Sequence, residues 1–239
     1  MISMEEEGKY GVIENRYQYH LVGPRARWRG LEVIRLFVAI ALEPALRGRV
    51  LEIEDRLARC GADVKWIQGP NLHLTLKFLG ETPRDKLEQV KAAMESASHA
   101  RAGFSVSFSG VGAFPNTRRP RVIWIGVDRD QSGLRELAGA MDDALAGVGF
   151  SREERGFTPH LTIGRVRSER NLHALSEALE GLISGGPGSP GDVGDSGGAD
   201  GGGRGLVIGS MNVSKVLLME SKLRPQGPIY SVLAEYALR

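Results

Sequence analysis

Two short segments of the sequence repeat the same pattern of residues, and the side chains of this pattern can act in catalysis. His73-Leu74-Thr75-Leu76 and His160-Leu161-Thr162-Ile163 both read His-Leu-Thr-apolar, and a proline lies shortly before each. Side chains alternate faces along a β-strand, so residues i and i+2 point to the same side. Each repeat therefore predicts a strand that presents an imidazole and a hydroxyl together, with its apolar residues on the opposite face.

A pair of histidines next to hydroxyl groups suits transfer at phosphorus without a metal. An unperturbed imidazole titrates at about pH 6.5, so near neutrality one ring of a pair can be neutral while the other is protonated. The neutral ring takes a proton from an attacking water, and the charged ring protonates the departing oxygen. Thr75 and Thr162 can donate hydrogen bonds to phosphoryl oxygens, where negative charge builds up in the transition state.

A zinc site is the competing interpretation of two histidines. Zinc needs at least one more protein ligand, and neither strand contains Asp, Glu or Cys. Lys77 and Arg165 follow the two repeats and would repel a divalent cation but attract a phosphate. The residues therefore favour a metal-free site, and we expect no metal and no cofactor.

Strict alternation assigns the neighbours of the two histidines to faces. Lys77 shares the face of His73 and Thr75, whereas Phe78 lies with the leucines that hold the strand to the core. Arg165 falls on the face opposite His160. A β-bulge at Gly164 would re-aim Arg165 towards the histidine, so a phosphate-binding role and a place on the other face remain equally open.

Several further residues are candidates for substrate contact. Lys77 could contact a ligand, although a solvated lysine is equally compatible with its position. The loop that contains Arg118, Arg119 and Arg121 could guide an RNA backbone, although most basic loops are only solvated. Phe114 and Tyr230 could stack on a base, although aromatic residues more often pack in the core. The remaining histidines, His20, His99 and His173, lie in polar stretches and are expected at the surface.

The periodicity of the chain indicates which elements position these residues. Hydrophobic runs with turn residues between them predict strands, and apolar residues spaced three or four apart predict helices. No Gly-x-Gly-x-x-Gly follows a strand and no P-loop motif occurs, so nothing supports a nucleotide-cradling loop. The order of elements favours an α+β fold over a doubly wound parallel sheet. We expect strands over 34–42, 64–68, 71–80, 104–114, 121–127, 156–166, 207–221 and 229–238, and helices over 43–60, 84–99, 131–146 and 171–182.

Two segments lack the apolar residues that a core requires. Residues 1–32 are polar and show no sustained period, so we expect an irregular extension. Glycine supplies 11 of the 21 residues from 185 to 205. Such a composition cannot bury enough apolar surface to offset the entropy of ordering it, so we expect a disordered insert over 184–205. The expected folded unit is a single domain over 33–239.

The composition of the 239-residue chain is that of an ordinary globular protein. Hydrophobic residues make up 41% and charged residues 25%. The net charge of +2 is too small for a protein that coats nucleic acid, so an anionic ligand would need a local site. A single cysteine excludes an intramolecular disulfide and fits a cytoplasmic location. The hydrophobic runs are too short to span a membrane, and the sequence shows no large apolar seam, so we expect a monomer.

The two repeats and their surroundings resemble the 2H phosphoesterase superfamily, and within it the RNA 2′,3′-cyclic phosphodiesterases, formerly described as 2′-5′ RNA ligases. The resemblance extends to IRLFVAIAL, WIQGPNLHLTLKFLGE, FPNTRRPRVIWIGV, FTPHLTIGRV and SKLRPQGPIYSVLAEYAL. It covers residues 34–238 apart from the glycine-rich segment. A single His-x-Thr-x is a weak signal, but two of them in these contexts are specific.

The resemblance implies a fold and an activity. The fold would be bilobal α+β, with two antiparallel sheets related by a pseudo-twofold axis around a central cleft and helices on the outside. The activity would be hydrolysis of an RNA 2′,3′-cyclic phosphate end to a 2′-phosphate, with His73 as proton donor and His160 as proton acceptor. Both tRNA fragments and small cyclic nucleotides are candidate substrates. The alternatives are cleavage or reversible ligation of 2′-5′ RNA linkages, and a non-catalytic module that binds RNA ends or nucleotides.

Overall fold

The computed structural model describes residues 32–128, 132–154, 156–184, 206–224 and 228–239. The predicted N-terminal extension and the glycine-rich insert lie almost wholly outside these residues. In chain order the elements are β1 (Val33–Ala41), α1 (Pro44–Ala58), β2 (Val64–Trp66), the 3₁₀ helix η2 (Gly69–Asn71), β3 (His73–Pro83), the 3₁₀ helix η3 (Arg84–Lys86), α2 (Leu87–His99), β4 (Phe104–Phe114), β5 (Val122–Val127), α3 (Ser132–Gly147), β6 (His160–Val166), α4 (Leu172–Ser184), β7 (Val207–Val213), β8 (Lys215–Lys222) and β9 (Ile229–Ala237).

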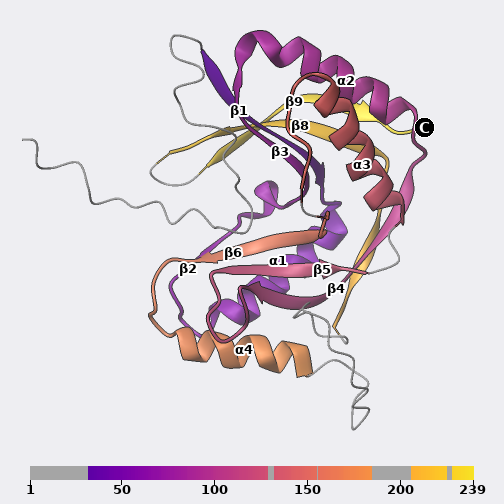
Figure 1. The fold of residues 1–239 in the computed structure, drawn as a ribbon. Helices are drawn as coiled ribbons and strands as arrows, with labels where there is room; N and C mark the ends of the chain where they lie inside the picture. Colours follow the sequence, from indigo (N-terminus) through magenta and orange to yellow (C-terminus); the bar gives the residue numbers. More distant parts are fainter. Residues whose placement is uncertain (1–31, 129–131, 155, 185–205, 225–227) are drawn as a thin grey trace, which may run out of the picture.

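The strands form two antiparallel sheets, which confirms the α+β fold class. The first sheet has the order β3-β1-β8-β9 and the second has the order β2-β6-β5-β4-β7. Helices α2 and α3 pack against the first sheet, and α1 and α4 pack against the second (Figure 1). Helix α1 follows a strand of the first sheet but contacts β6 and β7 of the second, and α3 follows β5 but contacts β3. The two halves are therefore interlocked through their helices.

The core follows from apolar residues at strand and helix spacing. In β1, Ile34, Leu36, Val38 and Ile40 are buried in the main core, which joins both sheets to the helices. Phe37 and Ala39 lie on the other face of the strand, in a small separate apolar cluster. This two-sided burial explains why β1 is a nearly continuous apolar run. Helix α1 buries four apolar residues spaced three or four apart: Leu46, Val50, Ile53 and Leu57.

The chain passes from one sheet to the other at two places that the sequence pattern does not show. The strands on either side of Pro70 do form, but they enter different sheets, because β2 pairs with β6 and β3 pairs with β1. The expected single strand over 207–221 is divided at Ser214 into β7 and β8, which again belong to different sheets. Strand pairing is a long-range choice, so a local run of apolar residues cannot show where the chain passes from one sheet to the other.

Candidate active site

The first histidine repeat contains a β-bulge. Thr75 pairs with Ala39 and Lys77 pairs with Val38, so Leu76 is an extra residue in β3. A bulge of this kind reverses the alternation of side chains beyond it. Phe78 therefore lies opposite Phe37, on the face that carries His73, and Lys77 lies on the core face.

The second repeat contains the same bulge at the matching position. Thr162 pairs with Trp124 and Gly164 pairs with Ile123, so Ile163 is the extra residue in β6. Arg165 lies opposite Val122 and consequently shares the face of His160 and Thr162. The bulge considered at Gly164 is thus present, and it moves Arg165 towards the histidine. The two repeats match position by position, as pseudo-twofold symmetry requires. We call the face of each sheet that carries its histidine the histidine face.

The bulge also corrects the sequence prediction for Lys77. Its side chain is only 5% exposed and forms an ion pair with Asp142 of α3. The Lys77 Nζ also donates a hydrogen bond to the backbone oxygen of Ser151, at 2.8 Å. The prediction that Lys77 shares a face with His73 is therefore wrong, because strict alternation does not continue through the bulge.

Both imidazoles are held by a backbone carbonyl two residues earlier in the chain. Nδ1 of His73 lies 2.7 Å from the oxygen of Asn71, and Nδ1 of His160 lies 2.9 Å from the oxygen of Thr158. A carbonyl oxygen only accepts hydrogen bonds, so Nδ1 carries the hydrogen in both rings. Nε2 is consequently the nitrogen that can exchange protons with a ligand. This arrangement is the same in both repeats.

Each imidazole also meets the edge or face of an aromatic ring. The Tyr230 ring is centred 5.2 Å from that of His73 at an interplanar angle of 90°, and the Phe114 ring is centred 5.2 Å from that of His160 at 87°. The Phe37 ring is centred 4.9 Å from that of His73. These contacts limit ring rotation and exclude water from part of each imidazole.

Burial and the positive charge of Arg165 both lower the pKa of the two histidines. Desolvation is the main cause that lowers the pKa of His73 and of His160, because it disfavours the charged ring. The hydrogen bond to the carbonyl raises each pKa, in opposition. The positive charge of Arg165 lowers the pKa of both rings. Arg165 therefore acts on both histidines, although they belong to different sheets.

The two histidine repeats are brought together where the sheets meet. Strands β3 and β6 contact one another, and no other strand of the described residues lies between them (Figure 1). Both imidazoles and both threonines are partly buried rather than fully enclosed. The arrangement places two proton-transfer groups, two hydroxyls and one guanidinium around the junction of the two histidine faces. Such an arrangement could bind an anionic ligand between the two imidazoles, so that one ring accepts a proton and the other donates one.

Comparison with known proteins shows the family to which the chain belongs. A family model for LigT-like phosphoesterases matches residues 40–124 and 125–189. The chain belongs to the LigT-like phosphoesterase family. It is 34% identical to an RNA 2′,3′-cyclic phosphodiesterase of Methanothermobacter thermautotrophicus, over 86% of this chain and 99% of that relative. It is also 34% identical to an RNA 2′,3′-cyclic phosphodiesterase of Aeropyrum pernix, over 79% of this chain and 94% of the relative. The resemblance found in the sequence is thereby confirmed.

Solved structures support the same assignment of the fold. The crystal structure of TT0787 from Thermus thermophilus has a TM-score of 0.66 and 25% sequence identity to this LigT-like phosphoesterase. The match covers 86% of this chain and 98% of the other.

The remaining sequence candidates differ in their relation to the histidines. Phe114 and Tyr230 contact the histidines with their rings. Arg118, Arg119 and Arg121 are exposed in the loop between β4 and β5. Sequence reasoning missed three aromatic residues of the histidine faces: Phe37, Phe78 and Trp124. Phe37 lies in a strand that is apolar on both faces, so its pattern could not distinguish a site residue from a core residue.

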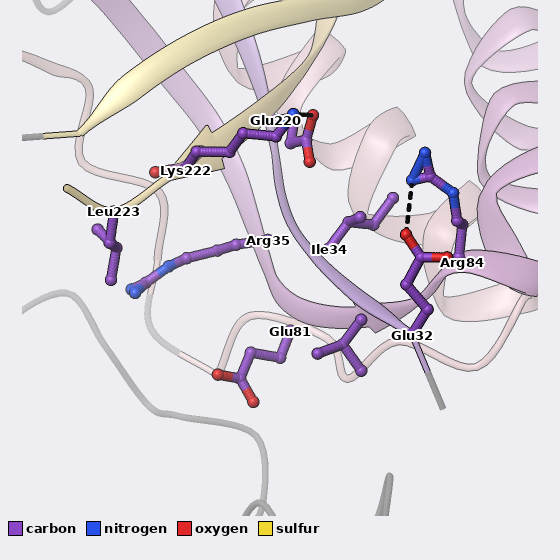
Figure 2. Close-up of a pocket in the computed structure, with 10 residues that line it drawn as sticks. Glu32, Ile34, Arg35, Glu81, Arg84, Glu220, Lys222 and Leu223 are labelled. Carbon is purple, nitrogen blue, oxygen red and sulfur yellow. Dashed lines mark ion pairs between the residues drawn. The ribbon is translucent and has the colours of Figure 1, made fainter. Parts of the chain in front are cut away.

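The described residues outside the histidine faces were also considered as sites for a metal, a membrane or a ligand. Within the described residues, no group of three or more His, Cys, Asp or Glu side chains could hold a metal ion. None of the helices in the described ranges is long and apolar enough to cross a membrane. A cavity of about 400 Å³ lies at the end of the first sheet, beside the start of β1 and the end of β3 (Figure 2). Its lining contains neither His73 nor His160.

Proposed function

We propose that this chain hydrolyses the 2′,3′-cyclic phosphate end of RNA to a 2′-phosphate, with His73 and His160 as the acid–base pair. The observation that carries the proposal is the matched anchoring of the two imidazoles. Each ring has Nδ1 fixed on a carbonyl oxygen, and Arg165 acts on both rings. A site for binding alone would not need two such proton-transfer groups.

The reaction depends on the protonation states of the two rings. The neutral ring of His160 takes a proton through Nε2 from the attacking water, whose oxygen forms a bond to phosphorus. The bond between phosphorus and the 3′ oxygen breaks, and its electron pair stays on that oxygen. The protonated ring of His73 donates its Nε2 proton there, which leaves a 3′-hydroxyl and a 2′-phosphate. The roles of donor and acceptor rest on the family resemblance, because Nδ1 of each imidazole has the same kind of partner, a backbone carbonyl two residues earlier.

The groups around the imidazoles are suited to a phosphate anion. The hydroxyls of Thr75 and Thr162 can donate hydrogen bonds to the two non-bridging oxygens, and Arg165 supplies a compensating charge. Without a ligand, burial and Arg165 favour neutral imidazoles. A bound phosphate favours a cation beside it, so substrate binding would help to protonate the donor ring.

The wider assignment combines the relatives with the fold. The relatives from M. thermautotrophicus and A. pernix are named RNA 2′,3′-cyclic phosphodiesterase, which supports an RNA end as the substrate. We assign the activity to one domain over 33–239, with 1–32 and the glycine-rich insert 184–205 outside the chemistry. Our proposal includes a cytoplasmic monomer that acts without a cofactor on RNA ends, with tRNA fragments and small cyclic nucleotides as candidate targets.

The test uses a short RNA with a 2′,3′-cyclic phosphate end, in the presence of a metal chelator. We expect conversion to a product with a 2′-phosphate and a 3′-hydroxyl. His73→Ala and His160→Ala should each lower kcat by roughly 10²–10⁴-fold. His99→Ala and His173→Ala, which remove exposed histidines, are the matched controls and should keep wild-type activity. Absence of turnover at every pH would reject the proposal, and a 3′-phosphate product would reject the assigned direction of ring opening.

The same assay separates the alternative activity. A chain that cleaves a 2′-5′ dinucleotide linkage faster than it opens the cyclic end would act mainly on internal 2′-5′ bonds. Unchanged turnover in both histidine variants would instead place the chemistry elsewhere.

A further inference from the structure

The loop between β4 and β5, residues 115–121, carries three exposed arginines beside the second histidine face. Its sequence is Pro-Asn-Thr-Arg-Arg-Pro-Arg and contains no acidic residue. Within the described ranges, Arg118, Arg119 and Arg121 form no ion pair. Some cations elsewhere on the surface do have carboxylate partners: Lys91 with Glu88, Arg101 with Glu136, and Lys215 with Glu235.

The backbone of this loop is fixed to both neighbouring strands. The Arg121 N–H donates to the oxygen of Phe114 at 2.8 Å, and the Val166 N–H donates to the oxygen of Arg121 at 3.0 Å. The Arg119 N–H donates to Oδ1 of Asn116 at 3.0 Å. Pro120 is buried between the exposed arginines. The arginines are therefore presented on a backbone that needs little ordering before it binds a ligand.

The loop continues directly from residues of the candidate active site. It begins after Phe114, whose ring contacts His160, and it ends before Val122, which pairs with Arg165. A polyanion with its terminal phosphate beside Arg165 can therefore continue along the loop and meet further guanidinium groups. Arginine is well suited to phosphate because its planar group donates several hydrogen bonds.

The cavity in Figure 2 shows the opposite electrostatic character. Its lining carries three cations and three carboxylates, and two of the cations form ion pairs with these carboxylates. The charges in that cavity balance, so it offers no preference for a polyanion. The residues concerned are Arg35, Arg84, Lys222, Glu32, Glu81 and Glu220.

We propose that the 115–121 loop binds the phosphate backbone of the RNA upstream of the cyclic end, and so makes the enzyme prefer oligonucleotides to mononucleotides. This inference rests on the proposed function and adds a determinant of substrate length. The whole chain has a net charge of only +2, so the preference would come from this local cluster rather than from a general attraction to RNA. A single-stranded RNA held by three arginines would also bind with a marked salt dependence.

The test compares kcat/KM on a 12-nucleotide RNA with a cyclic end and on a 2′,3′-cyclic mononucleotide. The variant Arg118→Gln/Arg119→Gln/Arg121→Gln removes three charges from the loop. The matched control, Lys91→Gln/Arg101→Gln/Lys215→Gln, removes three charges from other parts of the surface. We expect the ratio of the two kcat/KM values to fall roughly tenfold or more in the loop variant and to stay at the wild-type value in the control. The slope of log KM for the 12-mer against log salt should decrease by about 2 in the loop variant, because each phosphate contact on a single strand contributes about 0.7.

Each other outcome overturns a specific part of the reasoning. An unchanged ratio in the loop variant, or an equal fall in the control, would reject the loop as the binding tract. Equal loss on both substrates would assign the arginines to the chemistry or to the fold. A wild-type enzyme that opens both substrates equally well would reject the length preference but keep the proposed function. A wild-type chain that opens neither would reject the proposed function itself.

Discussion

Replacement of Lys77 by methionine is expected to lower the free energy of unfolding by about 2–4 kcal/mol. The Lys77 side chain is 5% exposed and its partner Asp142 is 19% exposed, so the ion pair is largely removed from water. Methionine keeps most of the volume of lysine but removes the cation, and it leaves the carboxylate of Asp142 without its countercharge. Removal of one partner from a buried pair usually costs about 3–5 kcal/mol. The expected loss of about 2–4 kcal/mol is smaller than this, because Asp142 still accepts a hydrogen bond from the backbone N–H of Glu153.

Thermal unfolding and urea titration provide the measurement. For a domain of 150–250 residues, each kcal/mol corresponds to about 2–4 °C in Tm, so the melting temperature should drop by roughly 4–16 °C. The double variant Lys77→Met/Asp142→Leu should recover much of this loss, because an apolar pair needs no countercharge. The exposed pair of Lys215 and Glu235 is the control, and Lys215→Met should change stability by less than about 1 kcal/mol. A loss below about 1 kcal/mol for Lys77→Met, or a double variant as unstable as the sum of the two single variants, would show that the ion pair is not a stabilising contact.

Three further changes test the site and its supports. Arg165→Gln should lower kcat/KM. Because Arg165 lowers the pKa of both histidines, the bell-shaped dependence of kcat/KM on pH should move to higher pH in this variant. A profile at the same or lower pH would contradict the effect of Arg165 on the histidines. Burial raises the pKa of Glu54 to about 8 from 4.5, so the unfolded state loses this proton first and stability should fall as pH rises from 4.5 to 8. After allowance for solvent relaxation the fall is on the order of 1–3 kcal/mol, and urea titrations of Glu54→Gln should show a smaller fall over this range. Gly112→Ala would place Cβ against the Trp124 ring, too close for an ordinary contact, so it should lower the free energy of unfolding by about 1–3 kcal/mol. The Trp124 ring contacts the Phe114 ring, so the substitution should also reduce turnover; a wild-type Tm would show that the indole can move aside.

Much of the fold could be predicted from local patterns. Helix α1 begins at Pro44 and ends at Ala58, close to the expected 43–60, because a proline in the first turn and apolar spacing are local signals. The strand that contains each His-Leu-Thr repeat was also expected. The sequence pattern could not predict which sheet each strand joins, because strand pairing depends on partners far away in the chain. Strands β2 and β3 are an example.

The candidate site also combines features that the sequence predicts with features that depend on the tertiary structure. The sequence by itself determined that His73 and Thr75 share one strand face and that His160 and Thr162 share another, because side-chain alternation is a property of a single extended strand. Only the tertiary structure decided the direction of the side chains beyond each repeat. The bulges at Leu76 and Ile163 exist because a partner strand supplies one residue opposite two.

The two bulges are alike, but different residues follow them, so the two repeats have different surroundings. One of them buries Lys77 against Asp142, and the other turns Arg165 towards both histidines. The contact between β3 and β6 then places the two histidine faces next to one another in the candidate site. The chemistry-bearing pairs are local features of the sequence, whereas the guanidinium that couples them depends on strand register, which is fixed only when both sheets are assembled.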